Sequence, residues 1–371
     1  MKHYKLSDIV VEINERENDP ANSKYERFVG LEHYVTGDVI IRNYGSTEML
    51  GSAMKVFRAG DVLVARRNVY LKRASMVDFD GLTSGDSIVL RAKTSLLGRV
   101  LPFVLNTDEF WDYADKYSDG TMSKRLSPKV LMQYEFDLPD EDELEHFVEV
   151  LWAANDAKEA YRHLLSATDD LVKSQFIEMF GDPITNSKGW ETKPLNEIAP
   201  EHSPKVPVES RYWWLNLDMI ESYSGNIIEK IYSDFDSIGS STSTFDSTMV
   251  LYSKLRPYLN KVVVPDDYGY ATTELVGLKP DERILNKYFL FNLLRSDNFV
   301  AYANGISGGT QMPRMPVKAL REFKCIIPPI ALQEQFVAIS HQSDKSKFEL
   351  KKAIENIDKL MKSLMQQDFS S

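Results

Sequence analysis

Two segments far apart in the chain carry basic, amide and aromatic side chains in a similar order. Residues 66–73 read Arg-Arg-Asn-Val-Tyr-Leu-Lys-Arg, and residues 254–261 read Lys-Leu-Arg-Pro-Tyr-Leu-Asn-Lys. Arginine and lysine neutralise phosphates and can bind guanine bidentately, asparagine reads adenine, and tyrosine adds a flat contact surface. We therefore treat both segments as candidate contacts to nucleic acid. The candidates are Arg66, Arg67, Asn68, Tyr70, Lys72 and Arg73 in the first segment, and Lys254, Arg256, Tyr258, Asn260 and Lys261 in the second.

A second pair of segments combines glycine with polar and basic residues. Residues 120–125 read Gly-Thr-Met-Ser-Lys-Arg, and residues 308–314 read Gly-Gly-Thr-Gln-Met-Pro-Arg. A glycine loop with polar and basic groups can approach a phosphate backbone closely. The candidates in these loops are Lys124, Arg125, Thr310, Gln311 and Arg314.

Both pairs also have a plainer interpretation, which the sequence leaves open. In the basic segments, tyrosine and leucine could belong to the core while the charges are solvated at the ends of strands. The glycine loops could be turns that cap a sheet.

The sequence lacks the signatures of a catalytic or metal site. It contains no Walker loop, no GxGxxG, no GxSxG, no HExxH and no Asn/Asp-Pro-Pro-Tyr/Phe tetrapeptide of the amino-methyltransferases. Asp267 and Glu274 resemble a carboxylate pair, but no lysine follows at nuclease spacing, so we interpret them as surface or turn residues. Cys325 is the single cysteine, and the six histidines offer no zinc spacing. We expect no catalysis, bound cofactor or metal in this chain.

Length and composition indicate a globular protein with two or three domains. The chain has 371 residues, of which 43% are hydrophobic and 27% charged, and no apolar run is long enough for a membrane span. We expect no membrane contact and a cytoplasmic location.

The net charge of −11 is unevenly distributed, because residues 55–93 hold eight basic and four acidic side chains, whereas residues 135–149 hold eight carboxylates and no Lys or Arg. The acidic run is best interpreted as a solvated face.

The candidate segments belong to a tandem repeat. An offset of 189 places Asp108 on Asp297 and Arg125 on Arg314, and an offset of 188 serves the middle of the repeat. A nearly constant offset over so many positions indicates two copies of one unit, about 1–182 and 190–371.

Each copy divides into a sheet-rich part and a long helix. Short β-branched and aromatic runs separated by turn residues predict mixed α/β domains over 1–140 and 190–328. Heptad spacing predicts long helices over 141–182 and 329–371, which suit an intramolecular coiled coil. The first helix has Lys158 and Gln175 as polar exceptions. Its apolar or small positions are Leu144, Phe147, Leu151, Ala154, Tyr161, Leu165, Thr168, Val172 and Met179, and those of the second are Phe336, Ile339, Leu350, Ile354, Ile357, Met361 and Leu364.

These motifs together resemble a known family. Residues 245–280, with Val-Leu-Tyr-Ser-Lys-Leu-Arg-Pro-Tyr-Leu-Asn-Lys at 250–261, look like the target-recognition domain of specificity subunits from type I restriction-modification systems. Residues 326–335, Ile-Ile-Pro-Pro-Ile-Ala-Leu-Gln-Glu-Gln, lead into a helix that resembles the distal conserved helix of that family.

The resemblance implies a fold and a function. The fold would be α/β (mixed α+β), with two pseudo-repeated DNA-recognition domains separated by two long antiparallel coiled-coil helices. The chain would be a non-catalytic subunit whose domains each read one half of a split target in double-stranded DNA, while the helices fix the unread gap. Its partners would be two methyltransferase subunits and the motor-endonuclease subunits, which would hold S-adenosylmethionine, ATP and Mg.

Two other functions remain open at this point. One is the specificity subunit of a type IIB restriction system, which the sequence does not distinguish from type I. The other is a coiled-coil protein scaffold that binds no DNA, for which the paired basic segments would be unnecessary.

Overall fold

The computed structural model describes residues 1–121, 123–234 and 241–369. Contacts between Cα atoms divide the chain into two units. Unit 1 consists of residues 1–162 and the chain from Lys351 onward, and unit 2 consists of residues 163–350. This division differs from the domain ranges expected from the sequence because each long helix contributes one part of its length to each unit.

Unit 1 contains two larger sheets and a two-stranded ribbon. The sheets have the strand orders β2-β10-β7-β8 and β3-β6-β9-β4-β5, and the ribbon pairs β1 with β11. Only β4 and β9 pair in parallel among these described strands. The strands are β1 (Lys2–Lys5), β2 (Val10–Ile13), β3 (Arg16–Glu17), β4 (Arg27–Val29), β5 (Gly45–Ser46), β6 (Met54–Phe57), β7 (Val62–Ala65), β8 (Ala74–Met76), β9 (Gly81–Thr83), β10 (Ser87–Ala92) and β11 (Glu135–Leu138). The helices and 3₁₀ turns are α1 (Leu6–Ile9), η1 (Pro20–Asn22), η2 (Leu31–His33), η3 (Val69–Leu71), α2 (Ser95–Val104), α3 (Asp108–Tyr117) and α4 (Pro128–Leu131).

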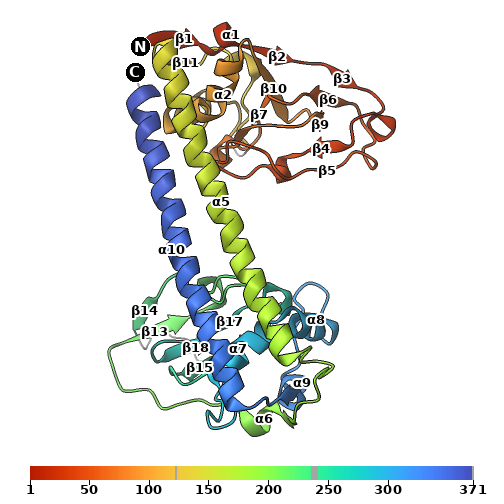
Figure 1. Ribbon diagram of the computed structural model, residues 1–371, viewed down its shortest axis with the longest axis vertical. Helices are drawn as coiled ribbons and strands as arrows, with labels where there is room; N and C mark the ends of the chain where they lie inside the picture. Colours follow the sequence, from red (N-terminus) through yellow and green to blue (C-terminus); the bar gives the residue numbers. More distant parts are fainter. Residues whose placement is uncertain (122, 235–240, 370–371) are drawn as a thin grey trace. The chain divides into compact units, whose positions relative to one another are not determined.

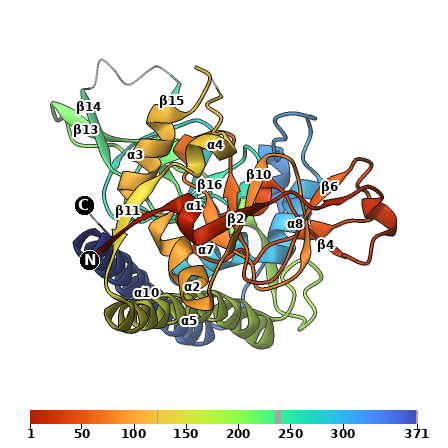
Figure 2. The ribbon, with the colours of Figure 1, turned by 90° about the horizontal axis from the view of Figure 1, so that it is seen from above.

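The apolar strand β7 is buried on both faces. Because side chains alternate along a strand, Val62 and Val64 enter one core cluster, and Leu63 and Ala65 enter another. The first cluster includes side chains of α2, and the second includes Phe57 of the neighbouring sheet. Figure 2 shows α2 beside the long helix, to which it is joined by the indole of Trp152 donating to the carbonyl oxygen of Arg99 at 3.0 Å.

Unit 2 repeats this architecture. Its sheets have the orders β14-β13-β18-β15 and β17-β16-β19, and a ribbon pairs β12 with β20. The strands are β12 (Thr192–Pro194), β13 (Arg211–Leu215), β14 (Ile231–Asp234), β15 (Thr242–Phe245), β16 (Val250–Ser253), β17 (Val262–Val263), β18 (Gly269–Thr272), β19 (Leu275–Leu278) and β20 (Lys324–Ile326). The helices and 3₁₀ turns are α6 (Leu195–Ile198), η4 (Leu217–Met219), η6 (Pro257–Leu259), α7 (Lys287–Arg295), α8 (Asp297–Gly305) and α9 (Val317–Glu322).

The tandem repeat is confirmed at the level of single elements. Strand order β6-β9-β4-β5 in unit 1 corresponds to β15-β18-β13-β14 in unit 2, and the parallel pair β4 with β9 corresponds to β13 with β18. The long helices α5 (Glu141–Phe180) and α10 (Ile330–Phe369) each have 40 residues, and they begin 189 positions apart.

The two long helices pair antiparallel within each unit, as Figure 1 shows. In unit 1, the end of α10 contributes Met361 to the core that holds Leu144 and Leu151 near the start of α5. In unit 2, Phe176 near the end of α5 packs with Phe336 near the start of α10, with ring centroids 5.3 Å apart. The expected mixed α/β fold with two long helices is thus observed.

The buried face of α5 differs in part from the heptad positions expected from the sequence. Tyr161, an expected heptad position, is 37% exposed, whereas Val148, outside that register, is fully buried. Lys158 was expected as a polar exception and is also buried. The physical reason is that α5 packs against the globular part of unit 1 as well as against α10, so it buries more than one stripe of side chains.

Candidate nucleic-acid interface

In unit 1, the basic-aromatic segment and the glycine loop lie against each other. The backbone N–H of Asn68 donates to the carbonyl oxygen of Lys124 at 2.9 Å, and that of Leu126 donates to the carbonyl oxygen of Arg66 at 2.8 Å. Two candidate segments that are far apart in the sequence therefore form one surface. Met122 of the glycine loop lies outside the described residues.

Unit 2 has the same arrangement. The N–H of Arg256 donates to the carbonyl oxygen of Pro313 at 2.7 Å, and that of Met315 donates to the carbonyl oxygen of Lys254 at 2.9 Å. We call residues 66–73 with 120–125 the paired loops of unit 1, and residues 254–261 with 308–314 the paired loops of unit 2.

A strained 3₁₀ turn presents a tyrosine in each set of paired loops. In unit 1, Asn68 and Lys72 flank η3 with φ values of 54° and 46°. In unit 2, Arg256 and Asn260 flank η6 with φ values of 49° and 48°. Positive φ is uncommon for residues other than glycine, and such conformations persist only where surrounding contacts hold them, often at functional sites. The central residue of each turn is exposed, with Tyr70 at 63% and Tyr258 at 42%.

Three candidates brace the loops from inside. Arg73 donates to the carbonyl oxygens of Leu31 and Arg67, both at 3.0 Å, and Lys261 Nζ donates to that of Leu217 at 2.6 Å. Partial burial lowers the pKa of both Arg73 and Lys261. Asn260 is only 7% exposed. Its side-chain amide donates to the carbonyl oxygen of Arg295 at 2.9 Å. In this conformation these three side chains support the loops rather than project from them.

Other candidates remain at the surface. Arg67, Arg125, Thr310, Gln311 and Arg314 are exposed, and Arg66, Lys124, Lys254 and Arg256 are half-buried. Among the described carboxylates, none lies within ion-pair distance of Lys254 or Arg256. The exposed side chains stay predicted contacts to nucleic acid.

Carboxylates that the sequence analysis did not assign to the interface lie at the centre of both sets of paired loops. Asp86 pairs with Arg125 and lies 3.5 Å from Arg67. Glu274, at the equivalent position of unit 2, pairs with Arg314 at 3.0 Å and raises the pKa of that guanidinium. The signal that could have found them is the offset of 188, which places Asp86 on Glu274.

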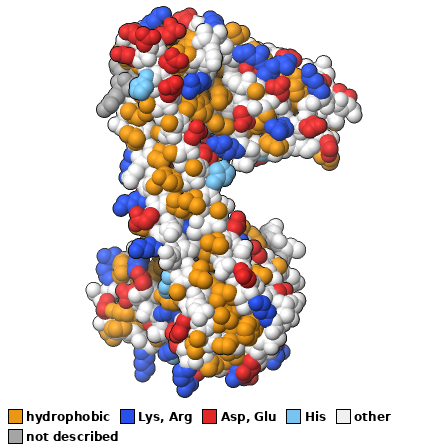
Figure 3. Space-filling model, in the orientation of Figure 1, with side chains coloured by type: hydrophobic (Ala, Val, Ile, Leu, Met, Phe, Trp, Pro, Cys, Tyr) orange, Lys and Arg blue, Asp and Glu red, His pale blue; other side chains and the backbone are white. Residues whose placement is uncertain are grey.

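Two further basic side chains in the paired loops of unit 1 also have acidic neighbours. Lys72 lies 2.8 Å from Asp108, and Lys124 lies 2.5 Å from Asp115. Figure 3 shows blue and red side chains next to each other on the visible face of unit 1. Carboxylates of the same unit therefore neutralise four of its six basic candidates, Arg67, Lys72, Lys124 and Arg125.

A model of the family described as "Type I restriction modification DNA specificity domain" matches residues 187–358. Residues 187–358 belong to this specificity-domain family. The resemblance recognised from the sequence is thereby confirmed for these residues. The matched range includes the paired loops of unit 2, the Glu274–Arg314 pair and the first part of α10.

A curated relative points the same way for part of the chain. The EcoDI specificity subunit of a type I restriction enzyme from Escherichia coli is 25% identical over 154 residues. The match covers 40% of this chain and 34% of the relative, so it spans about a third of that protein's length.

Solved structures share the fold over the whole chain. The S subunit of a type I restriction-modification system from M. genitalium has a TM-score of 0.58 and 12% identity, with 100% of this chain and 96% of that chain covered. A chain from a study of complex assembly and conformational transition of the type I R-M system has a TM-score of 0.54 and 17% identity, covering 99% and 97% of the two chains. The expected fold is confirmed by these similarities.

The specificity domain of unit 2 and the corresponding part of unit 1 carry equivalent paired loops, although the family model matches only the second copy. The described residues contain no group of three or more His, Cys, Asp or Glu placed to hold a metal ion. Among these residues, no helix has the length and apolar character needed to cross a membrane.

Proposed function

We propose that the chain is the DNA-reading specificity subunit of a type I restriction-modification complex. The observation that carries this proposal is the presence, in one chain with a specificity domain, of two equivalent sets of paired loops on two copies of one unit. Each set would read one half of a split target in double-stranded DNA. The helices α5 and α10 would fix the length of the unread gap.

The proposal implies partner subunits for the chemistry. Two methyltransferase subunits would bind S-adenosylmethionine and modify adenine, and motor-endonuclease subunits would use ATP and Mg. This chain would be non-catalytic and, because it acts on cellular DNA, cytoplasmic. Support for protein partners comes from Leu164, Leu171 and Phe348, which lie on the long helices in unit 2 and are 51%, 54% and 65% exposed. Leu164 and Leu171 lie seven positions apart on α5 and therefore share one helix face, and adjoining exposed apolar side chains are typical of interaction surfaces.

Mapping methylated adenines across a genome tests the proposal. The chain is co-expressed with its methyltransferase subunits, and Arg125→Ala is compared with Arg314→Ala. Because the two arginines occupy equivalent positions in different units, each substitution should relax recognition of one half-site only. Phosphate contacts fix the register of the base contacts beside them, so the loss should be confined to the half-site that the same unit reads.

Arg321→Ala is the matched control, since Arg321 forms an exposed ion pair with Glu201 and neither residue belongs to the paired loops of the same unit. It should leave the target unchanged. Equal loss at both half-sites would contradict the division of reading between units. A methylation pattern that does not depend on this chain would instead favour the protein scaffold.

A further inference from the structure

Glu274 holds Arg314 in the geometry with which arginine binds a phosphate. Arg314 Nε lies 3.2 and 3.3 Å from the two carboxylate oxygens, and Nη2 lies 3.0 Å from Oε1. The planar guanidinium binds carboxylate and phosphate through the same two-pronged arrangement of donors. An anion of the protein therefore occupies the edge of Arg314 that a DNA phosphate would use.

In unit 1, the arginine of the glycine loop also has a carboxylate partner, through one contact from Arg125 Nη2 to Asp86. Asp86 also lies 3.5 Å from Arg67, so one carboxylate is shared by two candidate DNA contacts. The arginines of both ion pairs are about half exposed, at 50% for Arg125 and 46% for Arg314. Because each arginine is half exposed, an external anion can reach its guanidinium and replace the carboxylate.

Backbone contacts fix both carboxylates in place. The carbonyl oxygen of Asp86 accepts from the N–H of Arg66 at 2.9 Å, and that of Glu274 accepts from the N–H of Lys254 at 3.0 Å. Each acid immediately precedes a core strand, β10 or β19. The carboxylate is thus anchored to the sheet, whereas its arginine partner comes from the glycine loop.

We infer that Asp86 and Glu274 are specificity-determining residues that compete with DNA phosphate for Arg125 and Arg314. This inference rests on the proposed function. A free arginine contributes to binding of any duplex, because phosphate contacts carry no sequence information. When a carboxylate must first be displaced, the contact forms only where base contacts supply the necessary energy. The two acids therefore weaken binding to wrong sequences more than binding to the target.

The sign of the effect distinguishes this role from a structural one. A carboxylate that merely stabilises the loops would, when neutralised, weaken binding to every duplex. A competing carboxylate would, when neutralised, strengthen binding to non-target DNA. Exposed ion pairs of this type are weak, so we expect each of Asp86→Asn and Glu274→Gln to tighten non-target binding about two- to fivefold. The plot of log affinity against log salt should steepen by about 0.9 for each additional phosphate that the protein neutralises.

The experiment measures equilibrium binding of the full chain, assembled with its methyltransferase subunits, at several KCl concentrations. The probes are a duplex carrying the mapped target and a scrambled duplex of equal length. Glu201→Gln is the matched control, because it removes the same charge from another exposed Glu–Arg pair in unit 2. The double variant Glu274→Gln with Arg314→Gln should not show the tighter binding, since the freed arginine is then absent.

The outcomes separate the inference from the proposed function. Competition is supported if Glu274→Gln binds the scrambled duplex more tightly than Glu201→Gln does. The double variant Glu274→Gln with Arg314→Gln must then lose this gain in affinity. The inference is overturned if Glu274→Gln binds the scrambled duplex no more tightly than wild type does. If wild type still prefers the target in that case, the proposed function stands. A wild-type assembly that shows no preference for the target overturns the proposed function, and the inference with it.

Discussion

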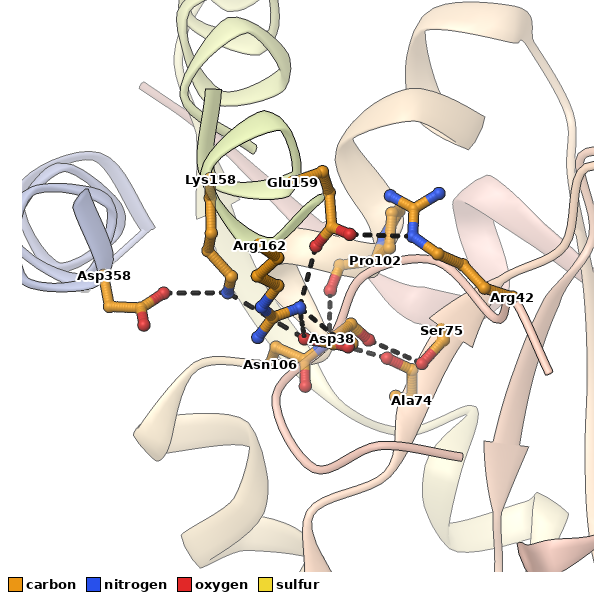
Figure 4. A network of polar contacts seen from close by, with 10 residues as sticks. All are labelled: Asp38, Arg42, Ala74, Ser75, Pro102, Asn106, Lys158, Glu159, Arg162 and Asp358. Atoms are coloured by element: carbon orange, nitrogen blue, oxygen red, sulfur yellow. Dashed lines mark hydrogen bonds and ion pairs between the residues drawn. The ribbon is translucent and has the colours of Figure 1, made fainter. Parts of the chain in front are cut away.

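Lys158 Nζ on α5 lies 2.8 Å from Asp358 Oδ1 on α10, and the side chain of Lys158 is only 7% exposed. Figure 4 shows this contact beside Asp38 and Arg162 of the same unit. In unit 2, Lys347 Nζ lies 2.9 Å from Asp169 Oδ1. The offset of 189 places Lys158 on Lys347 and Asp169 on Asp358. Each long helix therefore carries one lysine and one aspartate that meet the other helix, an arrangement that specifies helix register.

Substitutions of Asp358 and of Lys158 should have different effects on the free energy of unfolding. Asp358→Asn leaves the buried ammonium of Lys158 with Asp38 at 3.9 Å as its remaining carboxylate, and it should lower the free energy of unfolding by about 1 to 2 kcal/mol. Lys158→Met replaces the buried charge by an apolar side chain of similar length, and it should be nearly neutral. Urea unfolding of the full chain measures both. Equal destabilisation by the two substitutions would contradict this account.

The same contact predicts how half of the chain would assemble. A fragment of residues 1–182 contains both Lys158 and Asp169, so two copies of α5 can form the lysine–aspartate contact twice across a two-fold axis. We expect a dimer in light scattering. With the partner subunits, its methylated target should be a palindrome of the first half-site. Asp169→Lys should give a monomer because it sets like charges against each other. A stable wild-type monomer, or an asymmetric target, would refute the prediction.

Asp108 should stabilise unit 1 near neutral pH, and this contribution should be lost at acid pH. Hydrogen bonds from Lys362 and Lys72 lower the pKa of Asp108 to about 2, below its ordinary value of 3.8. A carboxyl group whose pKa is depressed on folding stabilises the protein above its unfolded pKa, and this stabilisation is lost as the pH falls from about 4 to 2. Asp108→Asn should therefore unfold at lower urea concentration than wild type at pH 6, and the difference should narrow below pH 4. Asp112→Asn, an exposed position on the same helix, controls for the change in net charge.

Substitutions at Asn260 and Tyr258, in the paired loops of unit 2, should distinguish a residue that stabilises the loop from one that contacts DNA. Asn260→Ala removes the donor to the carbonyl oxygen of Arg295 and places alanine at a φ of 48°, so it should destabilise the chain by about 1 to 3 kcal/mol. Tyr258→Ala at the exposed centre of η6 should change the free energy of unfolding by less than about 0.5 kcal/mol. Only Tyr258→Ala should weaken DNA binding without loss of stability. The reverse pattern would assign the support role to the tyrosine.

Several features follow from the sequence because they depend on residues close together in the chain or on a fixed offset. Heptad spacing predicts α5 and α10, since helix periodicity is a local property. The offsets of 188 and 189 predict that two copies share one fold, which the matching strand orders bear out. Residue types alone also single out 66–73 and 254–261, because basic and aromatic side chains have the chemistry of nucleic-acid contacts.

Tertiary structure decides which of those side chains are available. Asn68 lies beside Lys124 because the fold brings together segments more than fifty residues apart, and no local pattern records that contact. Asn260 and Tyr258 look equally suited to DNA in the sequence, yet only the tyrosine is exposed, because η6 turns the asparagine toward Arg295. Arg314 carries the same charge whether it is free or paired, and its pairing with Glu274 depends on the distance between two loops. Charge is therefore a property of the sequence, whereas burial and ion pairing are properties of the packed chain.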